Sequence, residues 1–152
     1  MDGDFANSQQ LKFWMNSLKA LPKIKAYGYS KSIPLFIELL KQGFNFPNNY
    51  RLNQSNGGKF DNSWQELESM ENAFFVRGRF LAVPLKGKRS GHNRTKKDRQ
   101  DIKATIGNQS IYKARTGRNY FVCPGDCGKC TNKGHACGID QFKNIDILIP
   151  IH

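Results

Sequence analysis

The sequence predicts an α/β protein with a parallel sheet. Segments with helical periodicity alternate with short apolar segments up to about residue 85, and the connections between them are short. This pattern favours right-handed βαβ crossovers. With 152 residues and 38% hydrophobic content, the chain can form one domain with its own core. We therefore expect a single domain over residues 1–152, made of a βα core (1–85), a basic insertion (86–118) and a cysteine-rich loop with a final strand (119–152).

Three helices are expected in the first half of the chain. The first, over about residues 8–20, can be capped by Asn7 or Ser8 and has apolar residues at helical spacing. These residues are Leu11, Trp14, Met15 and Leu18. Ser32 can cap a second helix, which ends at Gly43. Ser63 and Glu66 form the pattern of a capping box, so a third helix is expected to run to about residue 71.

Six short apolar segments are expected to form strands. They span about residues 23–29, 50–54, 73–76, 80–85, 119–122 and 145–149. Large apolar residues are few between residues 86 and 118, where we predict a short basic helix over about 95–106. No apolar run approaches the length of a membrane span, so a soluble protein is expected.

All the cysteines of the chain lie within fifteen residues, separated by gaps of three, two and six residues. They are Cys123, Cys127, Cys130 and Cys137. Such spacing lets four thiolates converge on one ion, because short glycine-rich loops bring the sulfurs into a tetrahedron. The segment therefore predicts a metal site.

The spacing of the cysteines does not identify the metal. Cys-x-x-x-Cys-x-x-Cys is the spacing of radical-SAM enzymes, but a fourth sulfur suits a structural zinc ion or an auxiliary iron–sulfur cluster. The Cys-Gly pairs at 127/128 and 137/138 resemble zinc knuckles, so we favour zinc. Two disulfides are the alternative; nothing at the N-terminus is typical of a signal peptide, and cytosolic thiols stay reduced. His135 could replace one sulfur, although a loop histidine beside four cysteine ligands is the simpler interpretation.

The net charge of +12 is concentrated in one part of the chain. Residues 77–118 contain thirteen Lys/Arg and two Asp/Glu, whereas the segments before and after them are nearly balanced. This asymmetry predicts a nucleic acid or other polyanion as partner, or a solvated insertion. The binding residues would be Lys86, Lys88, Arg89, Arg94, Lys96, Lys97 and Arg99. Tyr112 or His92 could stack on bases.

Polar residues gather where the predicted parallel strands end. In such sheets, function collects on the loops that leave the carboxyl ends of the strands. The residues are Asp4, Ser30, Lys31, Ser32, Ser55, Asn56, Gly57, Gly58 and Lys59. Together they could line an anion or cofactor cleft; the alternative is that Ser32 caps a helix and Gly57-Gly58 turns the chain. No Ser/His/Asp or Cys/His hydrolase arrangement is evident, because the three histidines lie in predicted loops or at the terminus.

Several short motifs resemble one protein family. They are Gly3-Asp4-Phe5, Pro22, Tyr27-Gly28-Tyr29-Ser30-Lys31-Ser32, Pro47-x-Asn49, Ser55-Asn56-Gly57-Gly58-Lys59-x-Asp61 and the late cysteine cluster. The chain resembles phage and bacterial proteins of the gene-product-eighty-eight type over about residues 2–83 and 120–138. That family is similar to radical-SAM half or full barrels. The resemblance implies a partial (half) βα barrel here, located in the cytoplasm, which for a phage protein is that of its host.

Family members carry further sequence, with cysteines, before the Gly-Asp-Phe strand, whereas this chain begins there. A complete radical-SAM site is therefore not expected. We also expect a partner, either a separately encoded N-terminal half or a second copy, because a truncated first strand would leave apolar surface uncovered. That surface would include Leu11, Trp14, Leu35 and Leu39. Two function classes follow. The protein is either a metal-bearing partial barrel or a nucleic-acid-binding module whose fold is stabilised by the cysteine site.

Overall fold

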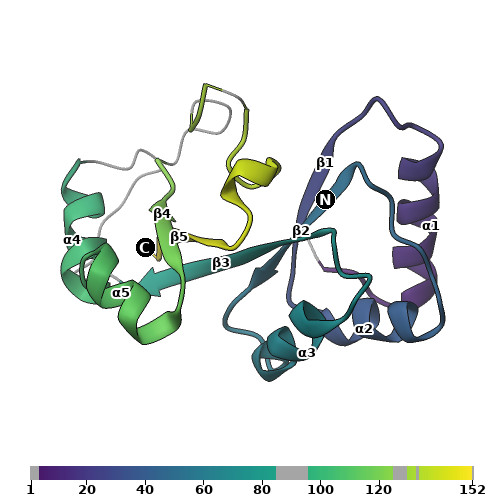
Figure 1. Cartoon of the computed structure of the whole chain (residues 1–152), viewed down its shortest axis with the longest axis horizontal. Helices are drawn as coiled ribbons and strands as arrows, with labels where there is room; N and C mark the ends of the chain where they lie inside the picture. Colours follow the sequence, from purple (N-terminus) through teal and green to yellow (C-terminus); the bar gives the residue numbers. More distant parts are fainter. Residues whose placement is uncertain (1–3, 85–95, 125–129, 133, 152) are drawn as a thin grey trace.

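A computed structural model describes residues 4–84, 96–124, 130–132 and 134–151 (Figure 1). Its five strands form one sheet in the order β1-β2-β3-β5-β4, and every neighbouring pair is parallel. The strands are β1 (Ala26–Ser30), β2 (Tyr50–Ser55), β3 (Val76–Pro84), β4 (Asn119–Val122) and β5 (Ile145–Ile151). The predicted α/β class with a parallel sheet is therefore confirmed.

The described helices are α1 (Ser8–Lys19), α2 (Ile33–Lys41), α3 (Trp64–Ser69), α4 (Lys96–Ile106) and α5 (Gln109–Thr116). Short 3₁₀ turns, η1 (Asp61–Ser63) and η2 (Asp140–Phe142), precede α3 and β5. Two helices begin with an asparagine cap, which satisfies a backbone N–H that the helix itself cannot. The Asn7 side chain accepts from the Gln10 N–H at 2.8 Å, and the Asn108 side chain accepts from the Ile111 N–H at 3.0 Å. No described helix has the length and apolar character needed to cross a bilayer.

One face of the sheet is covered by all five helices, in two groups. The larger core lies between α1, α2, α3 and the first three strands, and its centre is a stack of aromatic rings. In that stack the Phe46 and Phe75 ring centroids are 4.0 Å apart. The second core lies under α4 and α5, where Ile102 and Tyr112 pack against Tyr120 and Leu148. Figure 1 shows the two groups at opposite ends, with β3 running between them.

The opposite face is covered by the segment that connects β4 to β5. Alternating residues of the strands divide between the faces: Tyr120 belongs to the helix-side core, whereas Phe121 contacts this segment. Ala136 and Cys137 are buried there against Ile147. The sheet thus places the cysteine-rich segment on the face that the helices leave open.

Four sequence-based expectations need correction. Residues 80–85 do not form a strand separate from 73–76, because β3 is continuous and Gly78 lies within it. Helix α5 was not expected. The capping box does not form: Ser63 has helical dihedral angles and makes no capping hydrogen bond, and α3 ends at Ser69 rather than 71.

Leu11 and Leu39 are fully buried rather than poorly covered, although Trp14 is 37% exposed. The proposed truncated strand at Asp2-Gly3 lies outside the described residues.

Candidate functional site

Three of the four predicted metal ligands lie in one cluster on the open face of the sheet. Cys123 directly follows β4, and Cys130 and Cys137 come from the loop that crosses the sheet. All three belong to the cluster around Ala136 and Ile147. The fourth, Cys127, lies outside the described residues. The described residues alone contain no group of three or more ligand side chains arranged to hold a metal ion.

The sulfur of Cys130 is held by the backbone of its own loop. The Ala136 N–H donates to the Cys130 Sγ at 3.2 Å, and this Sγ lies 3.8 Å from the Gly134 carbonyl oxygen. Cys130 and Cys137 carry free thiols. Hydrogen bonds from backbone N–H groups to sulfur are a common feature around ligating thiolates, whose properties they tune. The Cys130 sulfur therefore accepts one hydrogen bond of the kind that ligating thiolates receive.

The Cys137 thiol is buried, and burial raises its pKa above the ordinary value. A hydrogen bond from Tyr29 and the positive charge of Arg77 act in the opposite direction, whereas Cys123 and Cys130 add to the rise. The pKa of the Cys137 thiol is thus sensitive to both of the other described cysteines. Without a bound cation, the protonated thiol is the favoured form of Cys137.

Polar contacts fix the cysteine segment to the first three strands. The Asn53 side-chain N–H₂ donates to the Cys137 carbonyl oxygen at 2.9 Å and to the Gly28 carbonyl oxygen at 3.1 Å. The His135 Nδ1 lies 3.1 Å from the Tyr27 hydroxyl. Gly138 packs so closely that a Cβ there would lie 2.8 Å from the Tyr27 ring. Residues 135–138 are therefore seated on strands β1 and β2.

Arg77 is the central polar residue beneath this segment. It is fully buried, and its Nη1 donates to the carbonyl oxygens of Phe142 and Ile145, each at 2.7 Å. It also donates to the Asn53 side chain and to the Arg79 carbonyl oxygen. Burial lowers its pKa to about 10, which still leaves the guanidinium charged at neutral pH. Sequence alone does not reveal this role, because the residue lies in a strongly basic stretch.

The predicted cleft residues are brought together at the carboxyl ends of β1 and β2, but the backbone N–H groups there are already bonded. The Asp4 carboxylate accepts from the backbone N–H groups of Lys31 and Ser32, at 2.5 and 2.8 Å, and from the Ser30 hydroxyl at 2.6 Å. The Asp61 carboxylate accepts from the N–H groups of Gly57 and Gly58, at 3.0 and 3.1 Å.

The remaining cleft residues link neighbouring loops. The Asn56 side chain pairs with the backbone of Ala82, and the Lys31 side chain packs on Gly58. The Lys59 ammonium lies 5.1 Å from the Phe60 ring centre. Ser55 ends β2. These loops are thus close together. The carboxylates of Asp4 and Asp61 already occupy the backbone N–H groups that an anion would bind.

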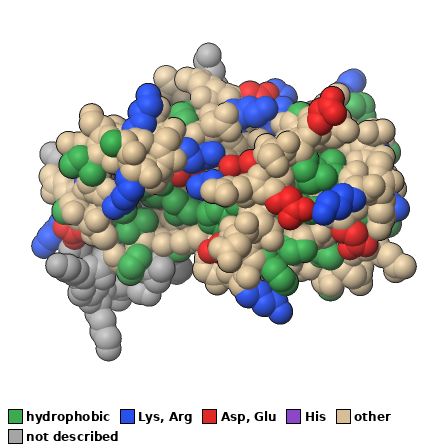
Figure 2. Space-filling view, turned by 60° about the horizontal axis from the view of Figure 1, so that its bottom comes forward, with side chains coloured by type: hydrophobic (Ala, Val, Ile, Leu, Met, Phe, Trp, Pro, Cys, Tyr) green, Lys and Arg blue, Asp and Glu red, His purple; other side chains and the backbone are tan. Residues whose placement is uncertain are grey.

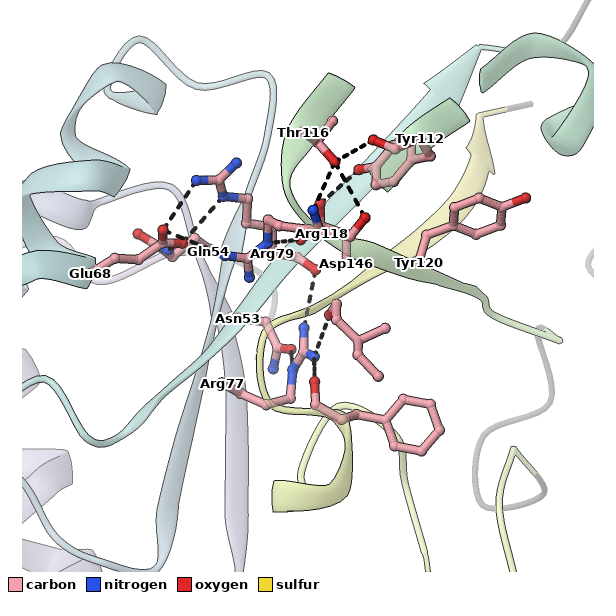
Figure 3. Close-up of polar contacts among 12 residues, drawn as sticks. Asn53, Gln54, Glu68, Arg77, Arg79, Tyr112, Thr116, Arg118, Tyr120 and Asp146 are labelled. Atoms are coloured by element: carbon pink, nitrogen blue, oxygen red, sulfur yellow. Dashed lines mark hydrogen bonds and ion pairs between the residues drawn. The ribbon is translucent and has the colours of Figure 1, made fainter. Parts of the chain in front are cut away.

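A polar network that sequence analysis did not predict connects the two helix groups (Figure 3). Glu68 of α3 pairs with Arg79 at 3.1 Å and with Arg118 at 3.6 Å. Arg118 donates to the buried Asp146 carboxylate at 2.7 Å, and the Tyr112 hydroxyl donates to the same carboxylate at 2.7 Å. Three arginines of the basic stretch therefore bind groups of the same chain: Arg77, Arg79 and Arg118. The net charge of residues 77–118 is thus larger than the charge that a partner could contact.

The basic cluster is described only in part. Lys97 is exposed on α4, whereas Lys86, Lys88, Arg89, Arg94 and the side chains of Lys96 and Arg99 lie outside the described part of the chain. His92 lies outside it as well. Tyr112 is buried and hydrogen-bonded to Asp146, so its expected stacking on bases is wrong. Figure 2 shows acidic and basic side chains interspersed on one face of the molecule.

Comparison with known proteins gives one match. Neither the curated proteins nor the solved structures contain a significant match to this chain. A family model described as "Gene product 88" matches residues 1–130, which include the polar loops at the ends of β1 and β2 and the first three cysteines. The chain therefore belongs to the gene product 88 family.

Proposed function

We propose that the protein is a metal-binding partial α/β barrel. One ion, bound by Cys123, Cys127, Cys130 and Cys137, would hold the segment between β4 and β5 against the sheet. The observation that carries the proposal is that three cysteines separated by up to fourteen positions pack in one cluster, in which Cys137 is buried and a backbone N–H donates to the Cys130 sulfur. Four thiolates fill the coordination sphere of zinc, so its role would be structural.

The partial-barrel assignment rests on how the sheet is covered. In a βα barrel, helices lie on the outer face of a parallel sheet and the inner face is closed by the other strands. Here the helices occupy one face, and the cysteine segment covers the face that would be internal. This arrangement supports a relationship to the C-terminal half of radical-SAM-like proteins, with the metal site acting as the inner cover.

The proposal is tested by metal analysis and absorption spectra of anaerobically purified protein. One zinc per chain without visible absorption is expected; iron with sulfide and absorption in the visible range would identify a cluster held by the same ligands. Replacing each cysteine by serine should lower the metal content, whereas His135→Ala should leave it unchanged. Metal-free wild-type protein of full stability, with four reactive thiols, would contradict the proposal.

Nucleic-acid binding is a second candidate, favoured by the exposed cations of the α4–α5 pair. Lys97, Lys103, Lys113 and Arg115 are all exposed there. If these four contact phosphates, affinity should fall about a hundredfold between about 50 and 200 mM salt, because each contact releases counterions. Changing Lys103, Lys113 and Arg115 to Gln should flatten this dependence. Lys41→Gln, at a surface site paired with Glu66, is the control. Absence of DNA and RNA binding at low salt would exclude this function.

A further inference from the structure

A cavity of about 460 Å³ lies between α1 and the edge strand β1, and neither the described cysteines nor helices α4 and α5 line it. Gln10, Trp14, Met15 and Leu18 of α1 line one side of it. Strand β1 lines the other side, and Asp4, Phe5 and Tyr50 complete the wall. None of the functions considered above uses this space.

Aromatic residues make up much of the wall. They are Phe5, Trp14, Tyr27, Tyr29 and Tyr50. Trp14 is 37% exposed, so its ring can be reached from solvent. The Tyr29 ring packs on Phe80, on the face of the sheet that carries the cysteine segment, with ring centroids 4.4 Å apart, so Tyr29 borders the cavity at the edge of β1. Aromatic faces carry partial negative charge and attract cations that approach them closely.

Asp4 adds a full negative charge to this wall. Its four hydrogen-bond donors are neutral groups: the Ser30 hydroxyl and the backbone N–H groups of Phe5, Lys31 and Ser32. Within the described residues, no Lys, Arg or His forms an ion pair with Asp4. The N-terminus of α2 offsets about half a unit charge at most. Burial, and then the Asp4 charge, raise the pKa of the Tyr50 hydroxyl, so the field of this carboxylate reaches the cavity wall.

We propose that this cavity binds an organic cation, an alkylated or quaternary ammonium group, with its charge between the Asp4 carboxylate and the Trp14 ring. An anion would be repelled by Asp4, and a neutral ring would leave the Asp4 charge without a counter-ion. An alkylated ammonium is weakly hydrated and presents C–H groups to the apolar wall. A small metal cation would lose hydration that the rings cannot replace.

The test compares two molecules of the same shape. Choline carries a quaternary ammonium, whereas 3,3-dimethyl-1-butanol has a carbon atom in place of the nitrogen. Calorimetric titration at constant ionic strength should show saturable choline binding, with the alcohol at least about tenfold weaker. Equal or tighter binding of the alcohol, or no saturable binding of choline, would overturn the proposal. If a trimethyllysine peptide binds more tightly than choline, the natural ligand is the side chain of a protein. If choline binds more tightly than the peptide, the natural ligand is a free metabolite.

Substitutions in the cavity wall show where choline binds. Asp4→Asn and Trp14→Leu should each weaken choline binding about tenfold. Trp14 is partly exposed on α1, so its replacement tests the site even if Asp4→Asn disturbs the start of α2. Phe74→Leu is the matched control, because Phe74 is 40% exposed and lies outside this cavity. An equal loss of affinity in Phe74→Leu, or unchanged affinity in Trp14→Leu, would place binding elsewhere.

Discussion

At the scale of single residues, carboxylates fix the loops at the carboxyl ends of β1 and β2. Asp4 and Asp61 each accept hydrogen bonds from two consecutive backbone N–H groups, in the two loops that were expected to form an anion cleft. An anionic ligand would have to displace them. The carboxylates therefore hold the shape of the loops, and a cavity lies beside Asp4.

The first prediction concerns Asp61. Asp61→Ala should lower the free energy of unfolding by about 1 kcal/mol, because the Gly57 and Gly58 N–H groups lose their acceptor. The neighbouring exposed residue provides the control: Asn62→Ala should change stability by less than about 0.5 kcal/mol. Urea unfolding of both variants measures the difference. Equal effects would show that the Asp61 contacts do not stabilise the loop.

The second prediction contrasts two buried tyrosines. The Tyr50 hydroxyl is buried and has no hydrogen-bond partner among the described residues, so Tyr50→Phe should leave stability unchanged or raise it by about 1 kcal/mol. The Tyr112 hydroxyl donates to the buried Asp146, so Tyr112→Phe should destabilise by about 1–2 kcal/mol. Thermal unfolding of the pair tests this. A larger loss of stability in Tyr50→Phe than in Tyr112→Phe would mean that the Tyr50 hydroxyl has a hydrogen-bond partner.

At the scale of elements, the helix starts differ in how they are capped. Asn7 and Asn108 bond to their helices through the side chain, whereas Ser63 makes no capping bond because the chain already turns helically through η1. The capping-box pattern at Ser63 and Glu66 is therefore a sequence signal that local geometry overrides. Glu66 instead pairs with Lys41 of α2.

The third prediction follows from this difference. Asn7→Ala and Asn108→Ala should each destabilise by about 1 kcal/mol, whereas Ser63→Ala should cost less than about 0.5 kcal/mol. Chemical denaturation of the three variants makes the comparison. A cost for Ser63→Ala equal to the other two would mean that the capping box forms in solution.

Sequence periodicity was sufficient for elements with one apolar face. Helix α1 has apolar residues at helical spacing, and β4 and β5 were predicted within two residues of their observed limits. Helix α5 escaped prediction because Tyr112 and Ile111 are its large apolar residues, and Ile111 is exposed. Two separate strands were predicted over 73–76 and 80–85, yet Gly78 lies inside the continuous β3 beside Arg118, where a Cβ would be 3.1 Å from the guanidinium. Such long-range contacts cannot be read from local patterns.

At the scale of the whole molecule, one polar network joins the two helix-side cores. Glu68 receives hydrogen bonds from Gln54 and Arg79, and with Asp146 it flanks Arg118. Its members come from α3, α5, three strands and the residue before β4, so it fixes the two helix groups relative to each other. The same spread explains why sequence did not predict it: its residues are separated by up to 92 positions, from Gln54 to Asp146.

The fourth prediction tests this network. Glu68→Gln should destabilise by about 2 kcal/mol, because the largely buried Arg79 guanidinium loses its carboxylate partner and Arg118 loses one of its two. Glu66→Gln removes an exposed pair from the same helix and should cost less than about 1 kcal/mol. Equilibrium unfolding at low and high salt distinguishes them. Similar small losses in both would mean that the two helix groups are held together by apolar contacts alone.

Cysteine spacing predicted that these thiols lie close together, and three of them do so in the described residues, whereas the metal itself stays a prediction. The location of the cysteine segment could not be predicted, since it depends on Asn53 and Arg77, which bind the segment from strands far away in the chain. Those two residues bring Cys137 to the sheet face that the helices leave open. A metal ion at this point would connect the end of β4 to the loop that rests on β1.

The most direct test of this account is a count of reactive thiols in the folded protein before and after metal chelation. We expect the protein purified without oxygen to react slowly at all four cysteines, and to expose four thiols once a chelator has removed the metal. The melting temperature should fall at the same time, because binding energy is coupled to folding of the segment. Four thiols that react at once without chelator, and an unchanged melting temperature, would contradict the metal site.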